Sequence, residues 1–331
     1  MITIFAGAGA SKALGYPTTD EFFTVGTGRA LQEDTVYKQV REYLEKPIPD
    51  VEDVLRLLYP FAALEDTPTG AFLRPHLRSN WVLRIPSFVR STNKVCFDHY
   101  GRVPSEPDVK RVYLPLVDYC RWSAERVSIF TTNYDPVTDA LLKMAELSGV
   151  PCYDGFNRFG ESDSGGYAKL KAGGLAIYRL HGSMSWVEQQ GTIRNTREYS
   201  PRLPGYAEHL IIYPGFKGNP EQEGHSAFRF AHTALRNELG ETSTVLMIGF
   251  SFRDPHLNAI FREALKTNQG LTMLVWNPIW PEGPDVGLGE LKQEYDNRII
   301  HFGQRFGDDQ AMAGLMERMK PDGGQPTADA R

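Results

Sequence analysis

Short apolar runs alternate with amphipathic helical segments along most of this chain of 331 residues. The apolar runs have the length and side chains of buried strands, and the segments between them repeat apolar residues every three or four positions. Strands are predicted at 2–6, 127–130, 176–180, 210–213, 244–248, 271–276 and 298–302, and helices at 136–148, 225–239, 256–266 and 308–319. Parallel strands require helical crossovers. The alternation therefore predicts an α/β fold, a Rossmann-like, doubly wound parallel sheet.

The region between the first two predicted strands has a helical pattern instead. Thr19 or Asp20 is expected to cap a short helix, Asp50 to cap another that begins at Val51, and a further amphipathic helix is predicted at 111–126. We expect one domain at 1–320 with a helical insertion at about 25–125, then a flexible, polar tail at 321–331. The insertion is expected to be a structural subdomain; the alternatives are a lid over a binding pocket and an oligomer contact.

Composition argues against several classes of protein. The chain has 36 Lys and Arg against 41 Asp and Glu, a net charge of −5, so no direct binding to nucleic acid is expected. Its three cysteines, Cys96, Cys120 and Cys152, form no C-x-x-C pair and cannot supply a four-cysteine zinc site, and no metal is expected. No apolar run reaches 18 residues, and the first residues have the pattern of a strand rather than a signal peptide. We expect a cytoplasmic protein without membrane association.

The first predicted strand runs into a glycine turn at Gly7, Ala8 and Gly9, followed by Ser11. Glycines allow a backbone to approach a pyrophosphate closely, and amides at the start of the next helix would face it. The same turn can also be no more than a tight connection between a strand and a helix. Alone, it leaves both interpretations open, because it is neither the G-x-G-x-x-G fingerprint nor a P-loop.

Four other segments follow predicted strands in the same way. They are T-T-N-Y-D at Thr131–Asp135, L-H-G-S at Leu180–Ser183, G-F-S at Gly249–Ser251 and W-N-P at Trp276–Pro278. Ligands of open α/β sheets bind at the carboxyl ends of the strands, so the five segments together predict one pocket. Asp254 is expected only to cap the helix at 256–266.

These five motifs, in this order, resemble those of the sirtuin superfamily, with G-A-G-A-S and G-Y-P first, then T-N-Y-D, H-G, G-F-S and W-N-P. The resemblance implies that NAD is the substrate. It implies that Asn133 orients the attacking water, His181 acts as general base and Asp135 braces the catalytic loop. Residues expected to contact NAD are Gly7, Ala8, Gly9, Ser11, Thr132, Gly249, Ser251 and Asn277.

The chain also departs from protein-deacylating sirtuins. Those enzymes carry a zinc ribbon on four cysteines after the H-G motif, whereas residues 191–202 here contain none. The pattern is closest to the prokaryotic sirtuin-like branch of anti-phage defence systems, which implies hydrolysis of NAD to nicotinamide and ADP-ribose. That resemblance also implies a homo-oligomer activated by a partner chain, a HerA-type ATPase or, as the weaker option, a short Argonaute. The alternatives are an NAD-dependent deacylase or ADP-ribosyltransferase, and a catalytically silent nucleotide-binding scaffold.

Overall fold

The structure is a computed structural model, and it describes residues 2–62, 68, 82–123, 125–156, 160, 173–189, 192–197, 199, 208–211, 226–280 and 287–308. The tail predicted at 321–331 and all but the first residue of the helix predicted at 308–319 lie outside the described residues. In the part that is described, no helix is both long and apolar enough to cross a bilayer.

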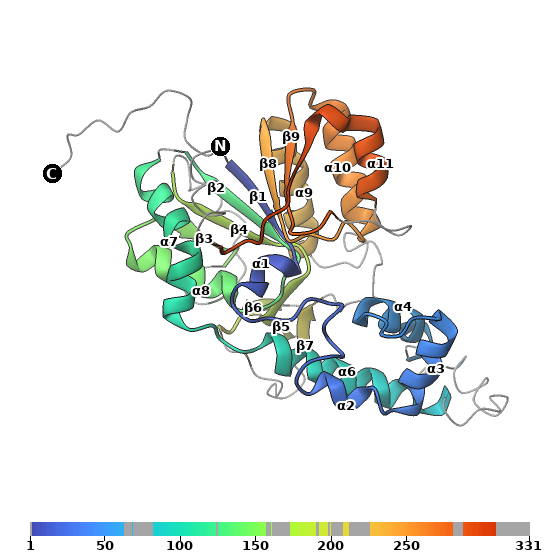
Figure 1. The fold of residues 1–331 in the computed structure, drawn as a ribbon. Helices are drawn as coiled ribbons and strands as arrows, with labels where there is room; N and C mark the ends of the chain where they lie inside the picture. Colours follow the sequence, from blue (N-terminus) through green and yellow to red (C-terminus); the bar gives the residue numbers. More distant parts are fainter. Residues whose placement is uncertain are drawn as a thin grey trace.

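Seven parallel strands form the main sheet (Figure 1). They are β1 (Ile2–Ala6), β2 (Val127–Thr131), β3 (Cys152–Tyr153), β4 (Leu175–Arg179), β8 (Thr244–Ile248), β9 (Thr272–Trp276) and β10 (Ile299–Phe302). Their order is β10-β9-β8-β1-β2-β4-β3. The chain therefore builds one half of the sheet outward from β1 and then returns to the other side of β1 with β8. The predicted doubly wound α/β fold is confirmed, and its switch point lies between β1 and β8.

Helices cover both faces of this sheet because successive strand residues point to opposite sides. In β1, Ile4 joins the buried cluster that includes Val112 and Leu141, whereas Phe5 joins the cluster that includes Leu235 and Phe261. The first face carries α1 (Ala8–Lys12), α7 (Glu106–Trp122) and α8 (Val137–Leu147). The second face carries α9 (Ser226–Glu241), α10 (Pro255–Thr267) and α11 (Leu288–Tyr295).

A group of helices lies to one side of the sheet (Figure 1). It consists of α2 (Gly28–Leu31), α3 (Thr35–Leu44), α4 (Val51–Ala62) and α6 (Ile85–Tyr100), and we call it the helical subdomain. The last helix of the segment predicted as an insertion, α7, packs instead against α8 beside the sheet. Asp50 caps α4 as predicted, since its Oδ1 accepts from the amide of Asp53 at 2.9 Å. No helix begins at Thr19 or Asp20: residues 19–27 form turns, because Glu21 bonds the backbone and hydroxyl of Thr18.

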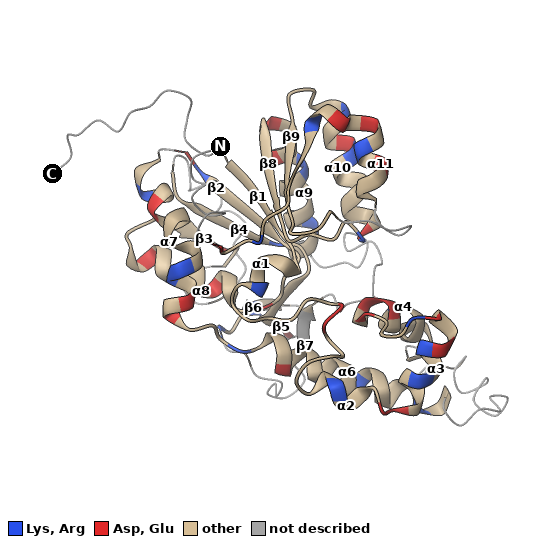
Figure 2. Ribbon diagram, viewed as in Figure 1, with Lys and Arg blue, Asp and Glu red and all other residues tan. Residues whose placement is uncertain are grey.

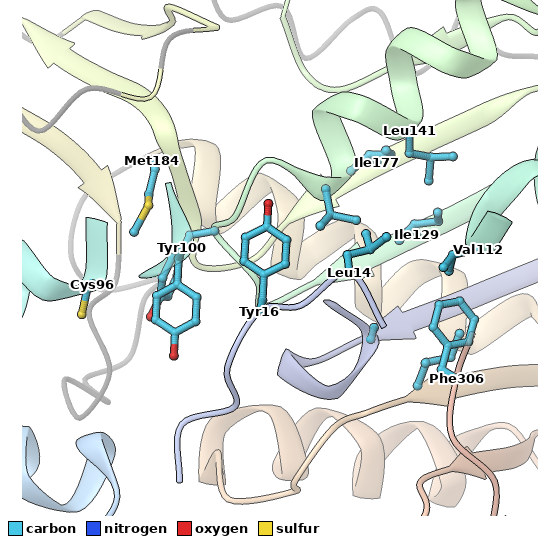
Figure 3. Close-up of a cluster of buried hydrophobic side chains, with 14 of the residues drawn as sticks. Leu14, Tyr16, Cys96, Tyr100, Val112, Ile129, Leu141, Ile177, Met184 and Phe306 are labelled. Carbon is cyan, nitrogen blue, oxygen red and sulfur yellow. The ribbon is translucent and has the colours of Figure 1, made fainter. Parts of the chain in front are cut away.

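One continuous cluster of buried side chains joins the helical subdomain to the sheet. Tyr100 from α6 packs edge to face on Tyr134, with ring centroids 5.4 Å apart. Figure 3 shows Tyr100 and Tyr16 between the apolar residues of the sheet face, such as Ile129, and Met184. The two parts therefore share a core, and a change in the packing of one alters the packing of the other.

Figure 2 shows acidic and basic residues mixed on α3, α7, α10 and α11.

The chain between His181 and the start of α9 contains a second, smaller sheet. It is antiparallel, in the order β6-β5-β7, with β5 (Gly182–Gln189), β6 (Thr192–Asn195) and β7 (Glu208–Ile211). The strand predicted at 210–213 as part of the parallel sheet is therefore wrong in its placement. It begins at Glu208 and pairs antiparallel with β5 because the chain turns back after β4 instead of crossing over a helix.

Candidate functional site

The two glycine turns meet at the switch point of the sheet. The amide of Gly7 donates to the carbonyl of Ile248 at 2.8 Å, and the amide of Gly9 donates to that of Gly249 at 2.9 Å. A Cβ on Gly9 would lie 2.7 Å from Cα of Gly249, and one on Gly249, whose φ is +60°, would lie 2.4 Å from Gly9. Only glycines allow this contact. The amides of Gly7 and Gly9 are therefore engaged with residues at the end of β8, and α1 begins at Ala8.

Asn133 connects the end of β2 to the first glycine turn. Its Nδ2 donates to the carbonyl of Gly7 at 2.8 Å and to Oγ of Ser11 at 3.0 Å. Its own backbone amide donates to Oγ1 of Thr131 at 3.0 Å, and the amide of Thr132 donates to the carbonyl of Ala6 at 3.2 Å. The half-buried amide group of Asn133 is therefore held in one orientation at the carboxyl edge of the sheet.

Asp135 lies deeper under the same turn and is 4% exposed. Its Oδ1 accepts from the amide of Val137, the first residue of α8, at 3.0 Å. Burial raises the pKa of its carboxyl to about 6, although hydrogen bonds from Ser11 and Val137 and the nearby Arg179 act in the opposite direction. Burial dominates because it disfavours the charged carboxylate.

A narrow cavity of about 20 Å³ lies beneath the glycine turn. Its polar lining comes from Ser11, Asn133 and Asp135, and its apolar lining includes Ile129 and Leu141. About one water molecule needs this much room, whereas small-molecule sites have hundreds of Å³. A ligand larger than water can therefore enter only if the surrounding side chains move.

His181 follows β4 and faces a residue from the other half of the sheet. Its Nε2 lies 3.4 Å from Oδ2 of Asp254, and the two side chains are 15% and 9% exposed. Asp254 also caps α10 as predicted, since its Oδ1 accepts from the amides of His256 at 3.0 Å and Leu257 at 3.1 Å. Sequence reasoning assigned only the cap and missed the histidine contact. The available signal was an acidic residue in the loop directly after a predicted strand.

Arg179, the last residue of β4, anchors the start of the loop that carries His181. It is 1% exposed, and its guanidinium donates to Oγ1 of Thr138 and, at 2.7 Å, to Oδ1 of Asp139. A buried arginine in the last position of a strand fixes the exit of the chain toward His181. This residue, too, was not predicted.

The loop after β8 is shaped by internal hydrogen bonds. Nδ2 of Asn277 donates to the carbonyl of Phe250 at 2.9 Å, and the amide of Gly249 donates to the carbonyl of Trp276 at 3.1 Å. Asn277 is 6% exposed, so it braces this loop, while Ser251 within it is half-buried. Phe252 has φ +56°, a left-handed conformation that turns the chain toward α10.

The same loop contacts the helical subdomain. Arg253 forms an ion pair with Asp50, and its Nη2 donates to Oγ1 of Thr19 at 3.0 Å. Asp50 is 8% exposed, and burial raises the pKa of its carboxyl even though Arg253 acts in the opposite direction. The residue next to Asp254 therefore ties the β8 loop to the cap of α4.

All five predicted loops thus meet at one edge of the sheet, joined through backbone and side-chain contacts around β1, β2, β4, β8 and β9. Among the residues that the structure describes, no group of histidine, cysteine and acidic side chains is arranged to hold a metal ion.

Residues 127–285 match the family model described as SIR2-like domain. The matched part includes Asn133, His181, Gly249 and Asn277 and excludes the first glycine turn. A search of curated protein sequences gives no match.

Solved structures of Sir2 proteins are similar over the length of the chain. A mutant Sir2 homologue with 2′-O-acetyl ADP ribose has 13% identity and a TM-score of 0.47, with 98% of this chain and 94% of that chain covered. A Sir2 homologue–NAD complex has 13% identity and a TM-score of 0.47, with coverage of 96% and 88%. A complex of Sir2 with a p53 peptide and NAD+ has 11% identity and a TM-score of 0.46, with coverage of 96% and 92%.

Proposed function

We propose that this chain is an NAD+ glycohydrolase that breaks the bond between nicotinamide and ribose and releases nicotinamide and ADP-ribose. One observation carries the proposal: an oriented asparagine amide, a half-buried histidine paired with a carboxylate and two interlocked glycine turns meet at one edge of the sheet, in a chain whose residues 127–285 match the SIR2-like family model. Dinucleotides bind at this place in doubly wound sheets.

The chemistry needs little from the protein because nicotinamide is already a cationic leaving group. Asn133 can donate and accept hydrogen bonds at once, and we assign it to orienting the attacking water beside the ribose. We assign His181 to the general base, since an imidazole can accept a proton near neutral pH. Asp135 has the supporting role of holding Ser11 and the start of α8 beneath the reacting atoms.

The acceptor is water in this proposal. Where deacylating sirtuins carry a zinc ribbon, this chain has the antiparallel sheet of β5, β6 and β7, and residues 191–202 contain no cysteine. The remaining residues are assigned to the other parts of NAD. Those at the pyrophosphate are Gly7, Ala8, Gly9, Ser11 and Thr132, and those toward the adenosine are Gly249, Ser251 and Asn277.

The narrow cavity supports a regulated enzyme. The cavity beneath the glycine turn has room for about one water molecule, so a ribose or nicotinamide ring can enter this cavity only if the surrounding side chains move. The tie between Arg253 and Asp50 gives the helical subdomain a direct connection to the β8 loop. We propose that assembly of the chain, or a partner such as a HerA-type ATPase or a short Argonaute, opens the site, and that the resulting loss of NAD serves anti-phage defence in the cytoplasm.

The test is to incubate the purified chain with NAD+, alone and with the product of the neighbouring gene, and to follow nicotinamide and ADP-ribose by chromatography. Asn133→Ala and His181→Ala are each expected to reduce cleavage by at least about 10²-fold. Asn237→Ala, on the exposed side of α9, is the control and should cleave NAD+ as the wild type does.

Circular dichroism and thermal melting establish that the variants are folded. Wild-type rates in both site variants would refute the site assignment. Transfer of ADP-ribose to protein without release of free ADP-ribose would refute hydrolysis in favour of a transferase, and absence of any NAD+ cleavage in all conditions would refute the proposed function.

A further inference from the structure

We propose that Asp254 is a positioning residue for His181, a role that rests on the proposed function. The two residues come from loops that β1 and β2 separate in the sheet, since His181 follows β4 and Asp254 precedes α10, beyond β8. Nevertheless Nε2 of His181 and Oδ2 of Asp254 lie 3.4 Å apart, and both side chains are largely buried. Capping of α10 by Asp254 does not require this contact with His181, so the pair needs an explanation of its own.

The carboxylate of Asp254 is held rigidly. Its Oδ1 accepts from two successive amides, those of His256 and Leu257, at the first turn of the 13-residue helix α10. These bonds and the positive end of the helix dipole favour the ionised carboxylate. With one oxygen fixed to the helix, the direction in which Oδ2 faces His181 is fixed as well.

This arrangement determines which nitrogen of His181 is available for chemistry. A carboxylate accepts hydrogen bonds only, so Asp254 favours the tautomer in which Nε2 carries the proton. Nδ1 then has the free lone pair and takes the proton of the attacking oxygen: the O–H bond breaks, the Nδ1–H bond forms, and Asp254 stays ionised. The negative carboxylate also stabilises the imidazolium that this transfer produces.

The distance of 3.4 Å is slightly longer than an ordinary hydrogen bond. Catalytic hydrogen bonds in free enzymes are often long and shorten when the substrate is bound. A movement of a few tenths of an ångström brings Nε2 and Oδ2 to hydrogen-bond distance.

The decisive variant is Asp254→Asn, because asparagine caps a helix as well as aspartate does. It keeps an oxygen for the amides of α10 but removes the charge, and its NH2 group favours the wrong tautomer of His181. We expect kcat for NAD+ to fall by about 10²-fold or more while KM changes by less than about twofold. Asp34→Asn is the matched control, because Asp34 caps α3 by accepting from the amide of Val36 at 2.8 Å. Removing the charge of this cap should leave kcat unchanged.

A second measurement needs no turnover. Nitrogen-15 spectra of histidine-labelled protein identify the protonated ring nitrogen, with the signals of His181 assigned from the His181→Gln variant. We expect protonated Nε2 in the wild type and protonated Nδ1 in Asp254→Asn.

The two arms separate this inference from the proposed function. A wild type that cleaves NAD+, with Asp254→Asn equally fast, would overturn the positioning role and leave the function standing. An inactive wild type whose His181 changes tautomer in Asp254→Asn would refute the function but support the pairing. The same tautomer in both proteins would overturn the proposal.

Discussion

Replacing Asp135 with asparagine is expected to stabilise the protein at neutral pH. Burial raises the pKa of this carboxyl to about 6 in the folded protein, whereas an exposed aspartate in the unfolded chain titrates near 3.8. A difference of about two pKa units corresponds to about 3 kcal/mol. Asparagine has the shape of the protonated acid and can accept from the amide of Val137, so it keeps the cap without the cost of a buried charge.

The sign of the pH dependence follows from the raised pKa. The protonated carboxyl contributes fully to the free energy of unfolding below pH about 4. This contribution is lost as the pH rises from about 4 through about 6, because in that range the unfolded state has lost its proton and the folded state still holds it. Wild type and Asp135→Asn should therefore be about equally stable at pH 4. At pH 7 the variant should be more stable by up to about 3 kcal/mol.

Urea unfolding at pH 4, 5, 6 and 7 measures this difference directly, and subtraction cancels the titration of all other groups. The control is Asn237→Ala, since Asn237 is exposed on α9 and has no titratable group. Its difference from wild type should vary little with pH. A flat difference for Asp135→Asn across this range, or a variant that becomes relatively less stable as the pH rises, would refute the reasoning from burial.

Two further predictions concern the loop after β8. Gly249→Ala should lower the free energy of unfolding by at least about 2 kcal/mol, because φ is +60° and the new Cβ would meet Gly9 at 2.4 Å. The control is Gly240→Ala, where a Cβ would meet nothing within 4 Å, and it should be neutral or stabilising. Equal melting temperatures for the two variants would contradict this prediction. Arg253→Ala should cost about 3 kcal/mol by leaving Asp50 buried without its cation, whereas Arg262→Ala, in an exposed pair, should cost less than about 1 kcal/mol in the same urea assay. Equal losses for the two arginine variants would show that burial of Asp50 is unimportant.

Much of the sheet could be predicted because its signals are local. The apolar runs of β1, β2 and β8 place strands within a residue of where they occur, and Asp50 and Asp254 mark the starts of α4 and α10. Helix α6 could not be assigned, although its buried residues repeat at helical spacing, because prolines and aromatic residues around it obscure the pattern.

The antiparallel sheet could not be placed for a different reason. Its strands β5 and β7 pair only when the chain turns back after β4, and their register shifts between Gly182 and Val187. A strand of four residues such as β7 has no feature of its own that selects a partner or a direction. The predicted roles of the site residues and the predicted domain limits stay predictions.

The amino-acid sequence by itself determined the fold class and the set of strand-end loops, because strand and helix periodicity are written within a few consecutive residues. Tertiary structure alone decided which loops touch. It locked Gly9 against Gly249, directed the amide of Asn133 onto the glycine turn, and brought His181 to Asp254 across the strands between them. Those contacts depend on strand order and on burial around Asp135, and both arise only when distant segments pack together.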